Sequence, residues 1–222
     1  MKLAIFTDIH GNLEALTAIL EDIQRNPVDD VICLGDVLGI GPNPKECLAQ
    51  IIQNHVKLVL GNHELYFLDG FHEKGISIEE FEYLEWERSF MDEEDRRFLK
   101  NCPLSLTYGK LQFSHFLIED EKSHMPFYPL DVLKQENLNY GNSSTIYIGH
   151  WHRPFIKEHI YGLGSSGCVP NDQAFYYILD TNTEVLQKVE VIFDRAAFVK
   201  KIKEIEYPGK DFVARTFFGI SS

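Results

Sequence analysis

Short apolar runs alternate with stretches of helical spacing over the first 60 residues of the chain. Residues 2–7 predict a buried strand, and apolar side chains from Leu13 to Ile23 then recur with the spacing of one helix face. Asn12 is a suitable N-cap for this helix, and Pro27 ends it. Two more strands are predicted at 30–34 and 56–60, with a helix at 44–54 between them. This β-α-β-α-β order predicts a parallel sheet with helices packed on it.

The pattern changes in the second part of the chain. Residues 66–101 are aromatic, acidic and helical in spacing, and they predict a small helical insertion. A hairpin is predicted through Gly109, and the polar residues 119–142 predict a long loop with a short helix. Later strands are predicted at 145–148, 155–161, 174–179 and 185–193, and helices at 196–206 and 211–218. Since no linker or repeat interrupts this order, we expect one α/β domain over residues 1–222.

Composition and charge narrow the class of protein. The chain is 44% hydrophobic and 25% charged, as in ordinary globular proteins, and 21 basic against 34 acidic residues give a net charge of −13. An acidic surface repels polyanions, so we expect no stable complex with nucleic acid. The apolar run at residues 3–6 is too short for a signal peptide, and no run approaches the roughly 18 residues of a membrane span. The 4 cysteines include no C-x-x-C pair, so we expect a cytoplasmic protein without membrane contact.

Side chains able to bind metal ions stand where the predicted strands end. They are Asp8, His10, Asp36, Asn62, His115, His150 and His152. Ligands in α/β proteins gather beyond the carboxyl ends of strands, so these side chains are expected at one edge. Imidazole, carboxylate and amide donors without thiolate suit Mn, Fe, Zn, Co or Ni better than Cu(I) or Ca. The donors are too many for one ion and enough for two.

The ordered set resembles the calcineurin-like metallophosphoesterases. Their pattern is D-x-H, G-D, G-N-H-[DE], a lone His and G-H-x-H, and here it stands at residues 8–10, 35–36, 61–64, 115 and 149–152. Residues 8–13 and 41–44 look like the small bacterial and archaeal phosphodiesterase branch of that superfamily. The resemblance covers nearly the whole chain. It implies a four-layer αββα sandwich of two mixed β-sheets with outer helices.

The resemblance also implies a role for each donor. Asp36 would bridge two metal ions, most simply manganese or iron, with zinc, cobalt and nickel as alternatives. The first ion would be held by Asp8, His10 and His152, and the second by Asn62, His115 and His150. A water bridging the two ions would lose its proton near neutral pH and attack phosphorus.

Two residues that follow Asn62 complete the implied catalytic set with Asp36. His63 would serve the leaving oxygen, and Glu64 would orient His63, although most relatives of the small branch carry Asp at that position. The segment that carries both His150 and His152 can serve two ions only if it bends, and Gly149 is the expected source of that bend.

The sequence says less about the substrate than about the metal site. Phosphoprotein phosphatases of this superfamily place phosphate-binding arginines where Ile40 and Leu60 stand here, which disfavours a protein or monoester phosphatase. We expect hydrolysis of phosphodiester or phosphoanhydride bonds, with a dinucleoside polyphosphate such as diadenosine tetraphosphate as the substrate hypothesis and generic phosphodiesterase activity as the alternative. Tyr66 and Phe116 are the expected stacking faces for a nucleotide, while Arg153 and the loop 162–170 would meet distal phosphates.

A non-enzymatic interpretation also stands beside this one. The small retromer subunit has the same fold and works as a protein-binding scaffold. A scaffold has no use for His10, His63, His115, His150 and His152 together, which favours the enzyme. An exposed aromatic insertion would support a homodimer.

Overall fold

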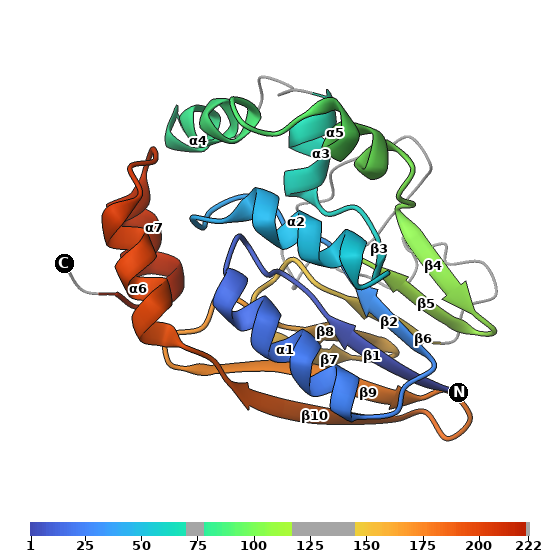
Figure 1. Cartoon of the computed structure of the whole chain (residues 1–222). Coiled ribbons are helices and arrows are strands. Elements are labelled where there is room, and N and C mark those ends of the chain that lie inside the picture. Colours follow the sequence, from blue (N-terminus) through green and yellow to red (C-terminus); the bar gives the residue numbers. More distant parts are fainter. Residues whose placement is uncertain (70–77, 117–144, 221–222) are drawn as a thin grey trace.

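The computed structural model describes residues 1–69, 78–116 and 145–220, and its strands form two five-stranded sheets (Figure 1). The first sheet has the order β10 (Val185–Ile192), β9 (Gln173–Asp180), β1 (Lys2–Phe6), β2 (Asp30–Cys33) and β3 (Lys57–Leu58). The second has the order β4 (Ser105–Tyr108), β5 (Leu111–Ser114), β6 (Thr145–Ile148), β8 (Ile160–Leu163) and β7 (Pro154–Lys157). The predicted α/β class with two mixed sheets and flanking helices is confirmed.

Each sheet is parallel between the strands that the metal-binding motifs follow, and each has two further strands that pair antiparallel. In the first sheet β1, β2 and β3 run parallel, and β9 and β10 are added antiparallel. In the second sheet β5, β6 and β8 run parallel between the antiparallel strands β4 and β7. Neighbouring parallel strands end on the same side, so five strand ends deliver their loops to one place.

The central strands are buried on both faces. All residues of β1 after Lys2 are fully buried, and every residue of β6 is buried, which explains apolar runs without alternation. Helix α1 (Leu13–Arg25) packs on β9, β10 and α2 (Pro44–Gln53) through five buried apolar side chains. The side chain of Asn12 accepts a hydrogen bond from the Ala15 N–H at 3.0 Å, and this is the predicted N-cap.

The remaining helices are α3 (Asn62–Asp69), α4 (Ile78–Arg88), α5 (Glu93–Lys100), α6 (Arg195–Glu204) and α7 (Lys210–Phe218). Of these, α3, α4 and α5 lie along the top of Figure 1, and α6 and α7 lie at its left, where α6 contacts α1. The rings of Tyr83 and Trp86 on α4 contact Tyr207, which lies between α6 and α7. The Tyr83 hydroxyl donates to the carbonyl oxygen of Gly41 at 2.6 Å. Aromatic packing therefore joins α4 to the segment between α6 and α7. The hydrogen bond of Tyr83 joins α4 to the loop that follows β2.

Some predicted boundaries were wrong. The strand expected at 155–161 is two antiparallel strands, β7 and β8, because the chain reverses at Glu158, where φ is +54°. The strand expected at 56–60 pairs only over Lys57–Leu58. The loop expected at 119–142 lies outside the described residues. Over the described ranges, no helix combines the length and the apolar character needed to cross a bilayer.

Candidate metal centre

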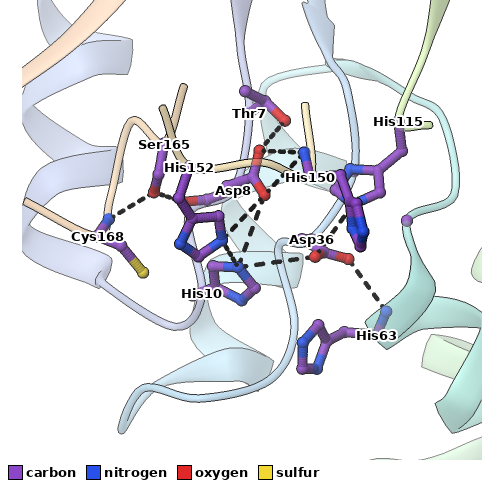
Figure 2. A network of polar contacts seen from close by, with 12 residues as sticks. Thr7, Asp8, His10, Asp36, His63, His115, His150, His152, Ser165 and Cys168 are labelled. Carbon is purple, nitrogen blue, oxygen red and sulfur yellow. Dashed lines mark hydrogen bonds and ion pairs between the residues drawn. The ribbon is translucent and has the colours of Figure 1, made fainter. Parts of the chain in front are cut away.

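The seven predicted ligands lie together where the parallel strands of both sheets end, and all but Asn62 are labelled in Figure 2. Loops after β1 and β2, the start of α3, and loops after β5 and β6 bring in Asp8, His10, Asp36, Asn62, His115, His150 and His152. Asp8, His10 and His115 are fully buried, whereas the side chain of His152 keeps 23% of its surface exposed. The site is therefore set deep on one side and reaches solvent on the other.

One group of donors consists of Asp8, His10 and His152, which we call half-site A. The Nε2 atom of His152 lies 3.2 Å from Oδ1 of Asp8 and 2.9 Å from Nε2 of His10. Asp8 is held from behind, because its Oδ2 accepts the Thr7 hydroxyl at 2.5 Å and both its oxygens face the His150 N–H at 3.2 Å. The donor atoms of half-site A converge on a common point.

The second group consists of Asn62, His115 and His150, which we call half-site B. The Oδ1 atom of Asn62 lies 3.2 Å from Nε2 of His115 and 2.9 Å from Nδ1 of His150. The other ring nitrogen of His115 is hydrogen bonded to the carbonyl oxygen of Leu34 at 2.7 Å, which directs its Nε2 toward the site.

Asp36 lies between the two half-sites. Its Oδ2 is 3.6 Å from Nε2 of His10 in half-site A and 3.1 Å from Nε2 of His115 in half-site B. Its Oδ1 accepts the backbone N–H of His63 at 3.0 Å. Of the predicted ligands, Asp36 is the carboxylate placed to serve both groups.

The backbone is strained at five of these positions. Asp8, His10, Asp36, His150 and His152 all have φ between +48° and +68°, a left-handed conformation that side chains rarely adopt. The bend expected at Gly149 is thus made by the two histidines themselves. Gly149 serves a different purpose, since a Cβ there would collide with the side chains of Thr7 and Asp8. Strain of this kind persists only where surrounding contacts enforce it.

Neighbouring imidazoles keep both carboxylates ionised. Burial works against ionisation of Asp8, but its hydrogen bond with His10 and the charge of His115 hold its pKa well below the ordinary value. Burial likewise opposes ionisation of Asp36, and the charges of His115 and His63 lower its pKa. The site therefore concentrates two negative charges in a dry environment.

The imidazoles divide into two classes. Burial would lower the pKa of each, but Asp36 raises the pKa of His115 to about 9, and a hydrogen bond with Asp8 raises that of His152 to about 11. Burial and the charge of His115 lower the pKa of His150 to about 4. Each half-site thus contains one imidazole that takes up a proton beside a carboxylate.

This donor set fits two cations. Two Nε2 atoms at 2.9 Å, those of His10 and His152, need a proton or a cation between them. Donor atoms of Asp36, His115 and His150 lie within 4.8 Å of one another, as do those of His10, Asp36 and His63. The nitrogen and oxygen donors suit first-row transition metals, and a cation in each half-site would replace the proton held there.

His63 lies beside this donor set at the start of α3. Its half-buried ring is 5.0 Å from the ring of His10, and it packs so closely on Gly39 that a Cβ at that position would collide with it. Burial lowers the pKa of His63 to about 3, with the charges of neighbouring imidazoles acting in the same direction and Asp36 against it. The ring is therefore neutral near pH 7 and offers an N–H group.

The expected contact of Glu64 with His63 is not among the hydrogen bonds of Glu64. Its two oxygens accept the backbone N–H groups of Gly61 and of residues 36–38, at 2.8–3.0 Å. Glu64 is fully buried in the first turn of α3, and its carboxylate satisfies these loop N–H groups. It ties the loop that carries Asp36 to the loop that carries Asn62, and does not orient His63 directly.

The three expected substrate contacts differ in accessibility. Tyr66 is half-buried, with its ring 5.7 Å from that of His63, and Arg153 is exposed next to His152. Phe116 is only 4% exposed, and its ring packs edge-on against His115. Burial to this extent leaves the Phe116 ring little open face, whereas Tyr66 and Arg153 keep exposed surface.

Two neighbours of His152 were not found from the sequence. The ring of Phe217 on α7 lies 5.7 Å from the ring of His152, and the sulfur of Cys168 lies within 4.8 Å of a ring nitrogen of His152. The sequence predicted the helix at 211–218 and a position of the loop 162–170 near the metal-binding residues. It contained no signal that either segment would contact His152. Such contacts depend on how distant segments pack.

Comparison with known proteins agrees with the geometry. The model of the calcineurin-like phosphoesterase superfamily domain matches residues 1–184. An uncharacterised protein of Methanocaldococcus jannaschii is 30% identical over 233 residues, which cover 90% of this chain and 92% of that protein. A metallophosphoesterase from Sphaerobacter thermophilus has the same fold, with a TM-score of 0.77, 22% identity and 99% of both chains covered.

A shorter match concerns one enzyme class. The symmetrical bis(5′-nucleosyl)-tetraphosphatase of Erwinia tasmaniensis is 39% identical over 71 residues, which are 31% of this chain and 26% of that enzyme. The match thus covers a minor part of both proteins. On the family model and the archaeal relative, which span most of its length, this chain belongs to the calcineurin-like phosphoesterase superfamily.

Proposed function

We propose that this protein hydrolyses phosphodiester or phosphoanhydride bonds at a two-cation site. The observation that carries the proposal is the convergence of half-sites A and B on the carboxylate of Asp36. Asp8, His10, His152 and Asp36 would hold one cation, and Asp36, Asn62, His115 and His150 the other. Bound there, two cations would supply Lewis-acid activation of water and neutralise charge on the phosphoryl group.

The remaining side chains supply positioning and hydrogen bonding. His63 would donate a hydrogen bond from its ring N–H to the leaving oxygen and stabilise the charge that develops there, a role supported by its neutral ring and its place beside Asp36. Glu64 would keep the Asp36 and Asn62 loops at a constant separation. Asp36 itself orients the start of α3 by accepting the backbone N–H of His63, so His63 and the bridging carboxylate are fixed relative to one another.

The substrate we favour is a dinucleoside polyphosphate such as diadenosine tetraphosphate. The match to symmetrical tetraphosphatases supports this choice, and Tyr66 is placed beside His63 where a base could stack. No arginine stands at residues 40 and 60, and Leu60 is buried, so a dianionic monoester lacks the clamp seen in phosphoprotein phosphatases. The histidine-rich site also favours the enzyme over the scaffold interpretation.

A substrate panel tests the proposal. The purified protein, loaded with Mn(II), is compared on diadenosine tetraphosphate, bis-p-nitrophenyl phosphate and p-nitrophenyl phosphate. We expect the highest kcat/KM on the dinucleotide, weaker cleavage of the aryl diester and the lowest rate on the monoester. Cleavage of the aryl diester without cleavage of the dinucleotide would leave a generic phosphodiesterase, and no hydrolysis at all would remove the enzymatic proposal.

A further inference from the structure

We propose that Cys168 is a positioning residue for His152 and thereby sets the cation affinity of half-site A. The inference rests on the proposed two-cation site, but it concerns a side chain that belongs to none of the sequence motifs. Cys168 follows β8 in the turn formed by residues 164–168 and is half-buried. Its sulfur and ring nitrogens of His10 and His152 lie within 4.8 Å of one another.

Two routes lead from Cys168 to Asp8. On the backbone side (Figure 2), the Cys168 N–H donates to the Ser165 hydroxyl oxygen at 2.8 Å, and that hydroxyl donates to the carbonyl oxygen of Asp8 at 2.8 Å. On the side-chain side, the Cys168 sulfur lies within 4.8 Å of a ring nitrogen of His152, whose Nε2 lies 3.2 Å from Oδ1 of Asp8. The position of the thiol therefore bears on the distance between two donors of half-site A.

The turn itself cannot drift relative to the loop after β1. The Gly167 N–H donates to the carbonyl oxygen of Asp8 at 3.1 Å, and the Ser166 N–H donates to that of Thr7 at 2.9 Å. The side-chain amide of Asn12 donates to the carbonyl oxygen of Gly167 at 2.8 Å. Because these bonds hold both ends of the turn, the thiol is presented to His152 from a rigid support.

The thiol lies outside the donor set. Figure 2 shows the sulfur of Cys168 on the side of the His152 ring that faces away from Asp8 and Asp36. The Nε2 atom of His152 is engaged with Asp8 and His10, so the thiol meets the opposite side of the ring. This is the arrangement in which an outer partner fixes the orientation of an imidazole that binds metal through its other nitrogen.

Two other imidazoles of the site, those of His10 and His115, are supported differently. His10 is hydrogen bonded through Nδ1 to the carbonyl oxygen of Leu38 at 3.1 Å, and His115 to that of Leu34 at 2.7 Å. A backbone carbonyl is a strong acceptor that no substitution removes, whereas a thiol is a weak one that a single substitution replaces. A substitution at residue 168 should therefore change the cation affinity of half-site A and leave that of half-site B unchanged.

Cobalt titration of the metal-free protein tests the inference without relying on turnover. Two binding steps are followed by visible absorption of Co(II) in the wild type, in Cys168→Ala and in Cys168→Ser. We expect Cys168→Ala to weaken one step by about 10- to 100-fold and to leave the other unchanged. Cys168→Ser restores an acceptor for the ring and should recover part of the loss.

Cys102→Ala is the matched control, because Cys102 is also half-buried but its thiol faces the carbonyl oxygen of Phe98 at 3.5 Å, away from the site. It should bind Co(II) as the wild type does. Unchanged binding in Cys168→Ala, equal weakening of both steps, or a thiolate-to-cobalt charge-transfer band in the wild type would each overturn the inference. A wild type that binds no Co(II) would remove the proposed function, and the inference with it.

Discussion

Half-sites A and B use the same kinds of donor but hold them in different ways. Both draw on the two sheets: His152 from the second sheet joins Asp8 of the first, and Asn62 of the first joins His115 of the second. In half-site B the outer contact of His115 is a backbone carbonyl, whereas in half-site A the outer contact of His152 is a thiol. Because each half-site takes donors from both sheets, the two sheets must pack together before either cation can bind. Half-site A depends in addition on the side chain of Cys168, which a substitution can replace.

The largest effect is expected at the residue that both halves share. Asp36→Asn removes a charge and an acceptor between His10 and His115, so both cations should be lost together with activity, by about 10³-fold or more. Elemental analysis and the hydrolysis assay on one preparation measure this. Asp172→Asn, at an exposed acid remote from the motifs, is the control. Wild-type metal content in Asp36→Asn would contradict the bridging role.

Single histidine substitutions should separate the halves. His152→Ala removes a donor of half-site A and His150→Ala one of half-site B, so each variant should retain about one cation per chain. Their Co(II) spectra should differ, because different donor sets remain. If both variants lose both cations, the halves are not independent and the comparison drawn above fails.

His63→Ala should spare both halves and affect turnover alone. The ring lies beside the donors and is proposed to act on the leaving oxygen, so kcat should fall by about 10²- to 10⁴-fold while two cations stay bound. The loss should be smaller for substrates with good leaving groups such as aryl diesters. Metal loss comparable to that of Asp36→Asn would show that His63 is a ligand and not a hydrogen-bond donor to the leaving oxygen.

Glu64→Gln tests the link between the loops of the two halves. The carboxylate accepts four backbone N–H groups, and an amide nitrogen in its place would face donors, so we expect a loss of about 2–4 kcal/mol in the free energy of unfolding. Urea denaturation of the metal-free protein measures it. Glu82→Gln, at an exposed position of α4, should stay within about 0.5 kcal/mol of the wild type. An equally small change in Glu64→Gln would disprove the anchoring role.

A smaller, pH-dependent effect is expected at Glu87, which supports the same loop. Its carboxylate accepts the Gly39 N–H at 3.0 Å, and burial raises its pKa from 4.5 to about 8. The folded state keeps this proton while the unfolded chain releases it. The contribution to stability is therefore full below pH 4.5 and declines as the pH rises to about 8.

Glu87→Gln should remove this dependence and keep the acceptor for Gly39. Between pH 5 and 7 the unfolding free energy of metal-free wild type should fall relative to the variant by about 2 kcal/mol. Denaturation curves of both proteins at several pH values measure the difference. Parallel pH profiles of the two proteins would show that Glu87 is ionised in the folded state.

Local sequence patterns were sufficient for the list of donors and for most elements around them. Buried strands appear as short apolar runs, and the residues just after such runs must lie at a strand end, so Asp8, Asp36 and His115 could be placed from the pattern alone. Helix α1 was predictable because its apolar spacing and its Asn12 cap are both local signals. The family resemblance added the division of donors between two cations.

The partners of these donors were decided only by tertiary packing. Glu64 accepts hydrogen bonds from loop N–H groups, and Phe116 is buried. The bend expected at Gly149 lies at His150 and His152. The bond from Ser165 to Asp8 spans 157 residues, and the thiol of Cys168 reached its imidazole through the same turn. Sequence alone determined which side chains stand at the strand ends, because strand and motif signals are local. Which atom each one faces depends on how two sheets meet, and no local pattern encodes that.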